Sequence, residues 1–291
     1  MNGGFPAELA AHLSDSVKTM RRRYRKRLAH CQEAFSETSV HDLRIETRRM
    51  LAMLDLLRAL HFPDSLKKTR KIFKKRLDAF DELRDTQVQL LLLKPLRRAF
   101  PEARAFDPLL RRREQRIIGE LRHDIKAMKQ VRLERRLKVV EKQLHEFASA
   151  GSPERTGTLA SAALREAFDE VVALRLRVRS SHTATIHRMR VAFKRFRYVS
   201  ELLQPLFPRL TAKQLRQMQA YQGLMGNIQD MEVLINAVKQ AVQLALLPAR
   251  DVRHLLKESM RRRRGLIDVF MAAADRLFEF QPDKFTQKTE P

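Results

Sequence analysis

One stretch of the sequence returns half a chain later. Residues 40–49, VHDLRIETRR, align with residues 186–195, IHRMRVAFKR, at an offset of 146 in a chain of 291 residues. A second stretch, DELRDTQVQL at 81–90, aligns with GNIQDMEVLI at 226–235 at an offset of 145. Repeats of this kind indicate one structural plan used twice. The sequence therefore predicts two internally related halves.

Breaks in the hydrophobic pattern divide each half into four helices. The segment SAGSPERTGT, 149–158, is dense in Ser, Gly, Pro and Thr and lies at the midpoint, as expected of a linker. Leu, Ala, Arg, Lys and Glu, which mostly favour helix, dominate elsewhere. The predicted helices cover residues 7–36, 39–60, 64–98 and 104–148, and then 157–180, 183–204, 210–246 and 249–280. Ser39 is expected to cap the second of them.

The predicted fold is therefore all-α. It consists of a four-helix bundle at 7–148, a linker at 149–156 and a second four-helix bundle at 157–281, related by a pseudo-two-fold axis.

The charge of the chain limits its partners. It has 59 Lys and Arg residues against 34 Asp and Glu residues, a formal net charge of +25. A compact chain with this charge repels itself unless an anion lies nearby. Nucleic acid, an anionic membrane surface and a phosphate polymer are the classes of partner that fit. The plainer alternative is a helical protein with a solvated basic surface.

The first repeat places its cations on one helix face. On a helical wheel, His41, Arg44 and Arg48 lie together, opposite the apolar side chains that would pack into a bundle. Tyr198 extends the equivalent row of the second repeat by one turn, with Arg197 beside it. That second row is His187, Arg190 and Lys194. Further candidate cations lie on other predicted helices: Lys18, Arg21, Arg22 and Arg25; Lys67, Lys71 and Lys74; Arg113; and Arg261 and Arg264.

Rows of this composition suit phosphate. Arginine offers a planar fork that binds phosphate bidentately, lysine a compact charge, and histidine one or two further N–H donors. Like charges stacked at this spacing repel each other, which an anion would relieve. A plainer interpretation of His41 and His187 is that each begins a helix and bonds to the backbone.

The pattern H-x-x-R-x-x-x-[RK]-R at 41–49 and 187–195 resembles the signature helices of the CHAD family, the conserved histidine α-helical domain. The resemblance implies two helical halves that face each other across a basic central cavity. It also implies binding of inorganic polyphosphate and association with polyphosphate granules. The residues it implicates are His41, Arg44, Arg48, Arg49, His187, Arg190, Lys194, Arg195, Arg197 and Tyr198.

The third-helix motif of that family, similar to G-x-x-R-D, is kept only in part. Asp81 replaces the glycine in the first half, and Gln229 replaces the arginine in the second. We therefore do not expect Arg84 to be a ligand, and expect Asp85 and Asp230 to orient arginines or support packing. Many relatives carry a triphosphate-tunnel domain with the motif E-x-E-x-K, which this sequence lacks. The resemblance thus implies a stand-alone, non-catalytic binding protein without cofactor or metal.

Two other functions remain open. The dipeptides His41-Asp42 and His123-Asp124 are compatible with a metal phosphohydrolase of the HD type, although the repeat replaces Asp42 by Arg188. Binding of RNA or single-stranded DNA also fits the charge, but such proteins interleave aromatic residues for base stacking.

The remaining features point to the cytoplasm. The single cysteine, Cys31, excludes an internal disulfide, and the sequence has no apolar run long enough for a membrane span. We therefore expect a cytoplasmic protein, associated with polyphosphate granules if the resemblance holds. Other polyanions are further candidate partners, and no membrane partner is expected. The sequence does not predict an oligomeric state.

Overall fold

The structure is a computed structural model that describes residues 4–60, 65–127, 130–150, 153–207 and 209–286. These residues form helices and connecting turns, with no strand among them, which confirms the predicted all-α class. The α-helices are α1 (Gly4–Ala34), α2 (Glu37–Ala59), α3 (Ser65–Ala79), α4 (Asp81–Leu93), α5 (Pro101–Ala127), α6 (Gln130–Ala150), α7 (Pro153–Arg175), α8 (Thr183–Leu203), α9 (Ala212–Gln243), α10 (Arg253–Ala273) and α11 (Asp283–Thr286). The 3₁₀ helices are η1 (Gln204–Leu206), η2 (Ala249–Val252) and η3 (Ala274–Phe280).

The helices that carry the repeat begin 146 residues apart, α2 at Glu37 and α8 at Thr183. The predicted helix at 210–246 is present as α9, but its counterpart at 64–98 is broken into α3 and α4. The predicted helix at 104–148 is also two helices, because α5 packs on α4 whereas α6 packs on α1 and α3. The pseudo-two-fold axis stays a prediction.

The break between α3 and α4 lies at Phe80, whose side chain is buried. The Phe80 amide donates to the carbonyl of Leu77, three residues back, at 3.2 Å. Arg44 of α2 donates to the same carbonyl at 2.8 Å and, through its other terminal nitrogen, to a carboxylate oxygen of Asp81 at 2.6 Å. Asp81 is also favourably placed at the positive end of α4. One arginine thus joins the end of α3 to the start of α4.

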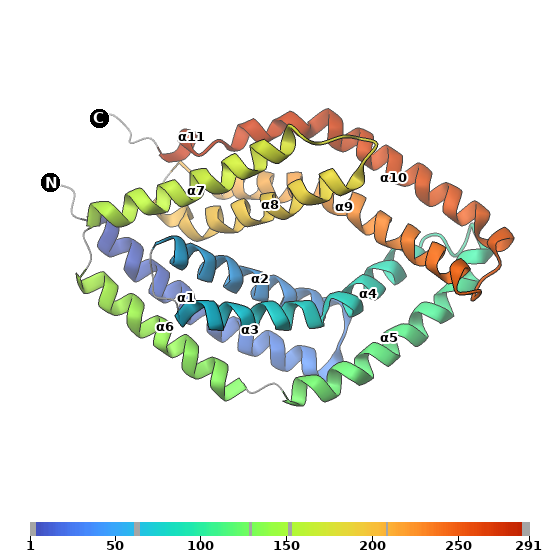
Figure 1. Ribbon diagram of the computed structural model, residues 1–291, viewed down its shortest axis with the longest axis horizontal. Helices are drawn as coiled ribbons and strands as arrows, with labels where there is room; N and C mark the ends of the chain where they lie inside the picture. The colour runs from blue at the N-terminus through green and yellow to red at the C-terminus, as the bar shows by residue number, and fades with distance from the viewer. Residues whose placement is uncertain (1–3, 61–64, 128–129, 151–152, 208, 287–291) are drawn as a thin grey trace.

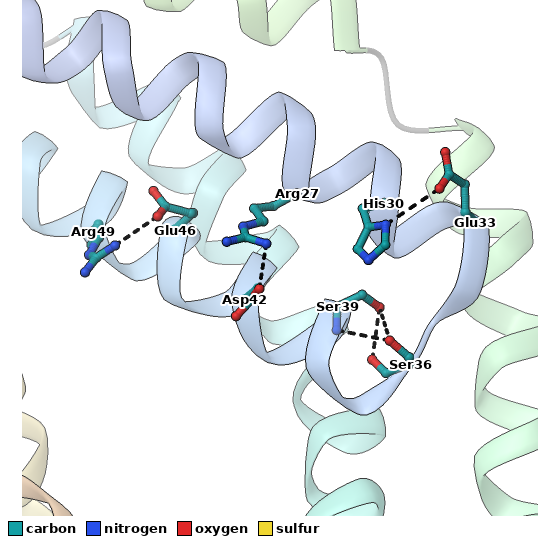
Figure 2. A network of polar contacts seen from close by, with 8 residues as sticks. All are labelled: Arg27, His30, Glu33, Ser36, Ser39, Asp42, Glu46 and Arg49. Carbon is teal, nitrogen blue, oxygen red and sulfur yellow. Dashed lines mark hydrogen bonds and ion pairs between the residues drawn. The ribbon is translucent and has the colours of Figure 1, made fainter.

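The start of α2 is fixed by a different serine from the one expected. The N-cap is Ser36, whose hydroxyl accepts the amide hydrogen of Ser39 at 3.2 Å (Figure 2). Ser39 lies inside the helix, where it is buried. Its hydroxyl donates to the Ser36 carbonyl at 3.0 Å. The predicted cap was therefore wrong by one turn.

The two halves of the chain lie side by side along the long axis of the molecule (Figure 1). Helix α2 contacts α8, α1 contacts α7, and α9 reaches across to α4. The start of α1 and the short helix α11 lie at the same end of the molecule (Figure 1). The helices that carry the two signature segments are therefore neighbours.

The apolar side chains form two clusters. The larger includes residues of both halves, among them Leu54 and Phe193, so the two halves share a core. The smaller joins α4, α5, α9 and α10 and includes Leu93. Along α9, Ile228 belongs to the larger cluster and Met231 to the smaller, which leaves a polar segment between the cores. None of the described helices is both long and apolar enough to cross a bilayer.

Candidate anion-binding site

Three cations from the two signature helices are close enough to act on one another electrostatically, where α2 contacts α8. They are Arg48 of α2 and Arg190 and Lys194 of α8, and each is half-buried. Within the described ranges, no ion pair or side-chain hydrogen bond involves any of the three. The Nε atom of Arg190 is buried and lacks a hydrogen-bond partner. We call Arg48, Arg190 and Lys194 the cation cluster.

The cation cluster is electrostatically strained. Burial, together with the neighbouring Arg48 and Arg190 charges, lowers the pKa of the Lys194 ammonium to about 6, while Asp230 opposes them. Burial, followed by the charge of Arg44, lowers the pKa of Arg48 to about 10. The pKa of Arg190 is also lowered by burial, against the attraction of Asp230 and Asp85. The charged form of each member is therefore disfavoured, and a bound anion would reduce that cost.

Two aspartates border the cluster without neutralising it. Desolvation raises the pKa of Asp230, against the attraction of Arg190. Desolvation also raises the pKa of Asp85, and the negative charges of Asp81 and Asp230 raise it further. Neither Asp85 nor Asp230 forms an ion pair within the described part of the chain. Their influence on the arginines is thus through space, rather than through the hydrogen bonds expected of orienting groups.

Asp85 also lines a hollow on the surface between α4, α5 and α9. Water reaches the carboxylate there, although the surrounding protein desolvates it. The lining residues are Glu82, Asp85, Gln89, Arg113, Val233, Asn236, Ala237 and Gln240. Because this lining mixes acids, amides and one arginine, the hollow is not the basic cavity expected from the sequence. That cavity stays a prediction.

The two signature histidines have different neighbours. His187 is exposed, and its Nδ1 lies 2.5 Å from Oε1 of Gln229, so Nδ1 carries the hydrogen and Nε2 is left for another contact. His41 is exposed on one side, and its pKa is lowered by desolvation and then by Arg84. Arg84 is itself paired with Glu37. The replacement of Arg84 by Gln229 in the repeat therefore changes the charge beside the histidine.

Arg197, Arg49 and Tyr198 are held by protein contacts. Arg197 is buried, donates to Gln222 at 2.9 Å and to Glu201, and lies over the Tyr198 ring at 4.4 Å. Arg49 donates to Glu46 at 2.9 Å (Figure 2). It also lies 3.6 Å from Glu201. Glu201 therefore ties the two signature helices together. Sequence reasoning missed Glu201, although its position four residues after Arg197 was a usable signal.

The other predicted ligands lie on the outer faces of their helices or in ion pairs of their own. Arg22, Arg25, Lys67, Lys71 and Arg264 are exposed. Arg21 pairs with Glu134 at 3.0 Å and Glu141 at 2.7 Å, which joins α1 to α6. The remaining pairs are Lys18 with Asp15, Lys74 with Asp78, Arg113 with Glu82, Arg195 with Glu170, and Arg261 with Glu258.

The aspartate that the first HD-type dipeptide would supply to a metal, Asp42, is held in an ion pair instead. Asp42 accepts from Arg27 of α1 at 2.7 Å (Figure 2). His123 and Asp124 are both largely exposed. The residues that the structure describes contain no group of three or more His, Cys, Asp or Glu side chains arranged to hold a metal.

Arg44 was predicted as a ligand, but its side chain is buried and both terminal nitrogens are occupied by Leu77 and Asp81. We expect Arg44→Met to lower the free energy of unfolding by about 1.5–3 kcal/mol, because it removes hydrogen bonds of a charged group. Urea denaturation followed by circular dichroism measures this. The control Arg22→Met, at an exposed position on α1, should change it by less than about 0.5 kcal/mol. Unchanged stability together with a tenfold loss of polyanion affinity would show that Arg44 is a ligand after all.

Comparisons with known proteins agree with this architecture. A family model described as the CHAD domain matches residues 18–239. Of solved structures, the CHAD domain from the plant Ricinus communis has a TM-score of 0.71 at 17% identity, covering 91% of this chain and 90% of that one. PptA from Streptomyces chartreusis has a TM-score of 0.59 at 17% identity, covering 93% and 99%. A search of curated proteins finds no match.

At this low identity the two structural matches establish the fold alone. The match to the family model establishes the family as well, because residues 18–239 make up most of the chain. They include both signature segments, 40–49 and 186–195, and therefore the whole cation cluster. The chain is a member of the CHAD domain family.

Proposed function

We propose that this protein binds inorganic polyphosphate, without catalysis, through the cation cluster and the histidines beside it. The observation that carries the proposal is the convergence of Arg48, Arg190 and Lys194 without a carboxylate in ion-pair contact with any of them among the described residues. Buried cations normally have partners, because an unpaired buried charge is costly. A polyanion would supply the missing partner.

The chemistry of the cluster favours phosphate over carboxylate. Two guanidinium groups and an ammonium group offer many N–H donors from two helices, and arginine matches the tetrahedral phosphate oxygens bidentately. Nε2 of His187 is left open by the bond to Gln229 and can contact a neighbouring phosphate. Exposed cations such as Arg22, Arg25 and Arg264 would extend the attraction along a chain. A repeating phosphate polymer uses all of these groups at once.

Nucleic-acid binding is the main alternative, and the position of Tyr198 argues against it. Single-stranded nucleic acids stack their bases on accessible aromatic rings. Tyr198 is the aromatic residue of the predicted rows, yet it is 6% exposed and Arg197 lies over its ring. The site therefore offers phosphate contacts without a stacking surface. Family membership supports the same choice, and association with polyphosphate granules in the cytoplasm follows as part of the proposal.

Titration with long-chain polyphosphate at several salt concentrations tests the proposal. If about eight phosphates are neutralised and the polymer behaves as a flexible single strand, log K should fall with log [salt] with a slope near −6. Isothermal calorimetry or fluorescence anisotropy gives the constants. No saturable binding at about 100 mM salt, or a slope near zero, would be incompatible with a multi-contact phosphate site.

A further inference from the structure

Lys194 differs in its surroundings from the other lysines that the structure describes. It is half-buried on α8 near two arginines: Arg190, one helical turn before it, and Arg48 of the contacting helix α2. The positive charge of Arg44 on α2 has a weaker effect, and the carboxylate of Asp230 on α9 acts in the opposite direction. No ion pair within the described residues holds its ammonium group. It therefore combines partial access to solvent with two flanking anion-binding groups.

These surroundings make the side chain a nucleophile at neutral pH. A lysine that is desolvated or lies beside other cations loses its proton easily, and the neutral amine is the reactive form. At pH 7.5 about one in a thousand ordinary lysine side chains is neutral, whereas a lysine with a pKa of about 6 is mostly neutral. A less basic amine attacks more slowly, which offsets part of this difference. The net reaction rate of Lys194 should therefore exceed that of an ordinary lysine by about tenfold.

We propose that Lys194 is a modification site that small acyl phosphates acylate, and that this acylation weakens the polyanion binding proposed above. The phosphate group of the reagent binds to Arg48 and Arg190, which brings its carbonyl carbon to the Lys194 amine. Nitrogen forms a bond to that carbon, and the bond from carbon to the phosphate oxygen breaks. Phosphate leaves with the bonding electron pair and takes the proton lost by the amine. The products are an amide on Lys194 and inorganic phosphate.

The modification would act directly on the binding site. A bound polyanion favours the protonated, charged form of the amine, and an amide cannot take up that proton. The acylated cluster would therefore meet the polyanion with its two arginines and without a third cation. The second half of the proposal rests on the proposed function, whereas the acylation itself depends only on the amine and the two arginines. The two can therefore be tested separately.

Peptide mapping by mass spectrometry tests the acylation on the full-length protein. With acetyl phosphate at pH 7.5, we expect Lys194 to be acetylated at least about tenfold faster than Lys138, an exposed lysine on α6. The ratio of the two rates should fall with N-acetoxysuccinimide, which carries no phosphate, and in the Arg48→Gln variant. Equal rates at Lys194 and Lys138 would overturn the proposal, and so would a ratio independent of the reagent.

Affinity measurements test the consequence. Wild-type protein treated with acetyl phosphate should lose polyphosphate affinity about tenfold, while Lys194→Arg, which keeps the charge but has no amine of this kind, should be unaffected by the reagent. Acetylation at Lys194 with unchanged affinity would overturn the regulatory half and remove Lys194 from the proposed binding site. Rapid acetylation in a protein that binds no polyphosphate even when untreated would instead contradict the proposed function and leave the modification site in place.

Discussion

Replacing Arg48, Arg190 and Lys194 together by glutamine is expected to weaken binding of long-chain polyphosphate by at least about a thousandfold. Each charge-assisted contact contributes about 1.5–3 kcal/mol, so three contacts at the lower value already give this loss. The members of the cluster repel one another, so their single effects need not add. Fluorescence anisotropy with labelled polyphosphate at fixed salt measures the three single variants and the triple.

The matched control removes the same charge elsewhere. Arg132, Lys138 and Lys142 are exposed cations on α6, and their joint replacement by glutamine should weaken binding less than about tenfold, through the reduced net charge alone. Circular dichroism shows whether each triple variant is folded. Equal losses in the two folded triples would mean that diffuse surface charge, and not the cluster, holds the polymer.

Lys194→Met is expected to make the unliganded protein more stable near neutral pH. Replacing buried ionic groups by well-packed apolar side chains of similar size is often neutral or stabilises a protein by about 1–4 kcal/mol. Lys194 has no ion pair among the described residues to offset the cost of its charge. Burial and the flanking arginines lower the pKa of Lys194 to about 6 from its usual 10.5. Between these two values the unfolded chain binds more protons than the folded protein, so stability rises with pH through this window. Below about pH 6 both states are protonated and the full penalty is present.

The advantage of Lys194→Met should therefore be largest at pH 6 and shrink toward pH 10. Urea denaturation at pH 6, 7.5 and 9 measures it, with Lys138→Met as the control, for which the change should stay within about 0.5 kcal/mol. The same Lys194→Met variant should bind polyphosphate more weakly, since it removes a cation of the site. Opposite signs for stability and affinity are characteristic of a site strained for function. A less stable Lys194→Met protein at pH 6 would mean that Lys194 is paired and structural.

The helix faces could be predicted from the sequence, but the depth of each cation in the protein could not. Helical periodicity places Arg44 and Arg48 on one face of the second predicted helix. It does not show that Arg44 is buried against the break at Phe80, because that break has no glycine or proline to mark it. The helix-capping signal was similarly ambiguous, since Ser36 and Ser39 are both suitable residues.

Local ion pairs could have been predicted, whereas long-range ones could not. Some pairs lie within a single helix at the spacing of stabilising pairs. Lys74 pairs with Asp78, four residues later, and Arg261 pairs with Glu258, three residues earlier. The pairing of Arg21 with Glu134 depends on where α6 packs, and the sequence had joined α6 to α5 in one helix. The repeat did identify the segments that form the cluster. It did not show which of their cations would remain without carboxylate partners.

A competition between long-chain polyphosphate and single-stranded RNA of equal charge tests the central claim most directly. With labelled polyphosphate bound to the wild-type protein, unlabelled polyphosphate should displace it at concentrations at least about tenfold lower than RNA, because the cluster offers phosphate contacts and Tyr198 offers no free ring. In the triple glutamine variant of Arg48, Arg190 and Lys194, this preference should disappear. RNA that competes as well as polyphosphate, or a preference that survives in the triple variant, would contradict the assignment of the cation cluster as a polyphosphate site.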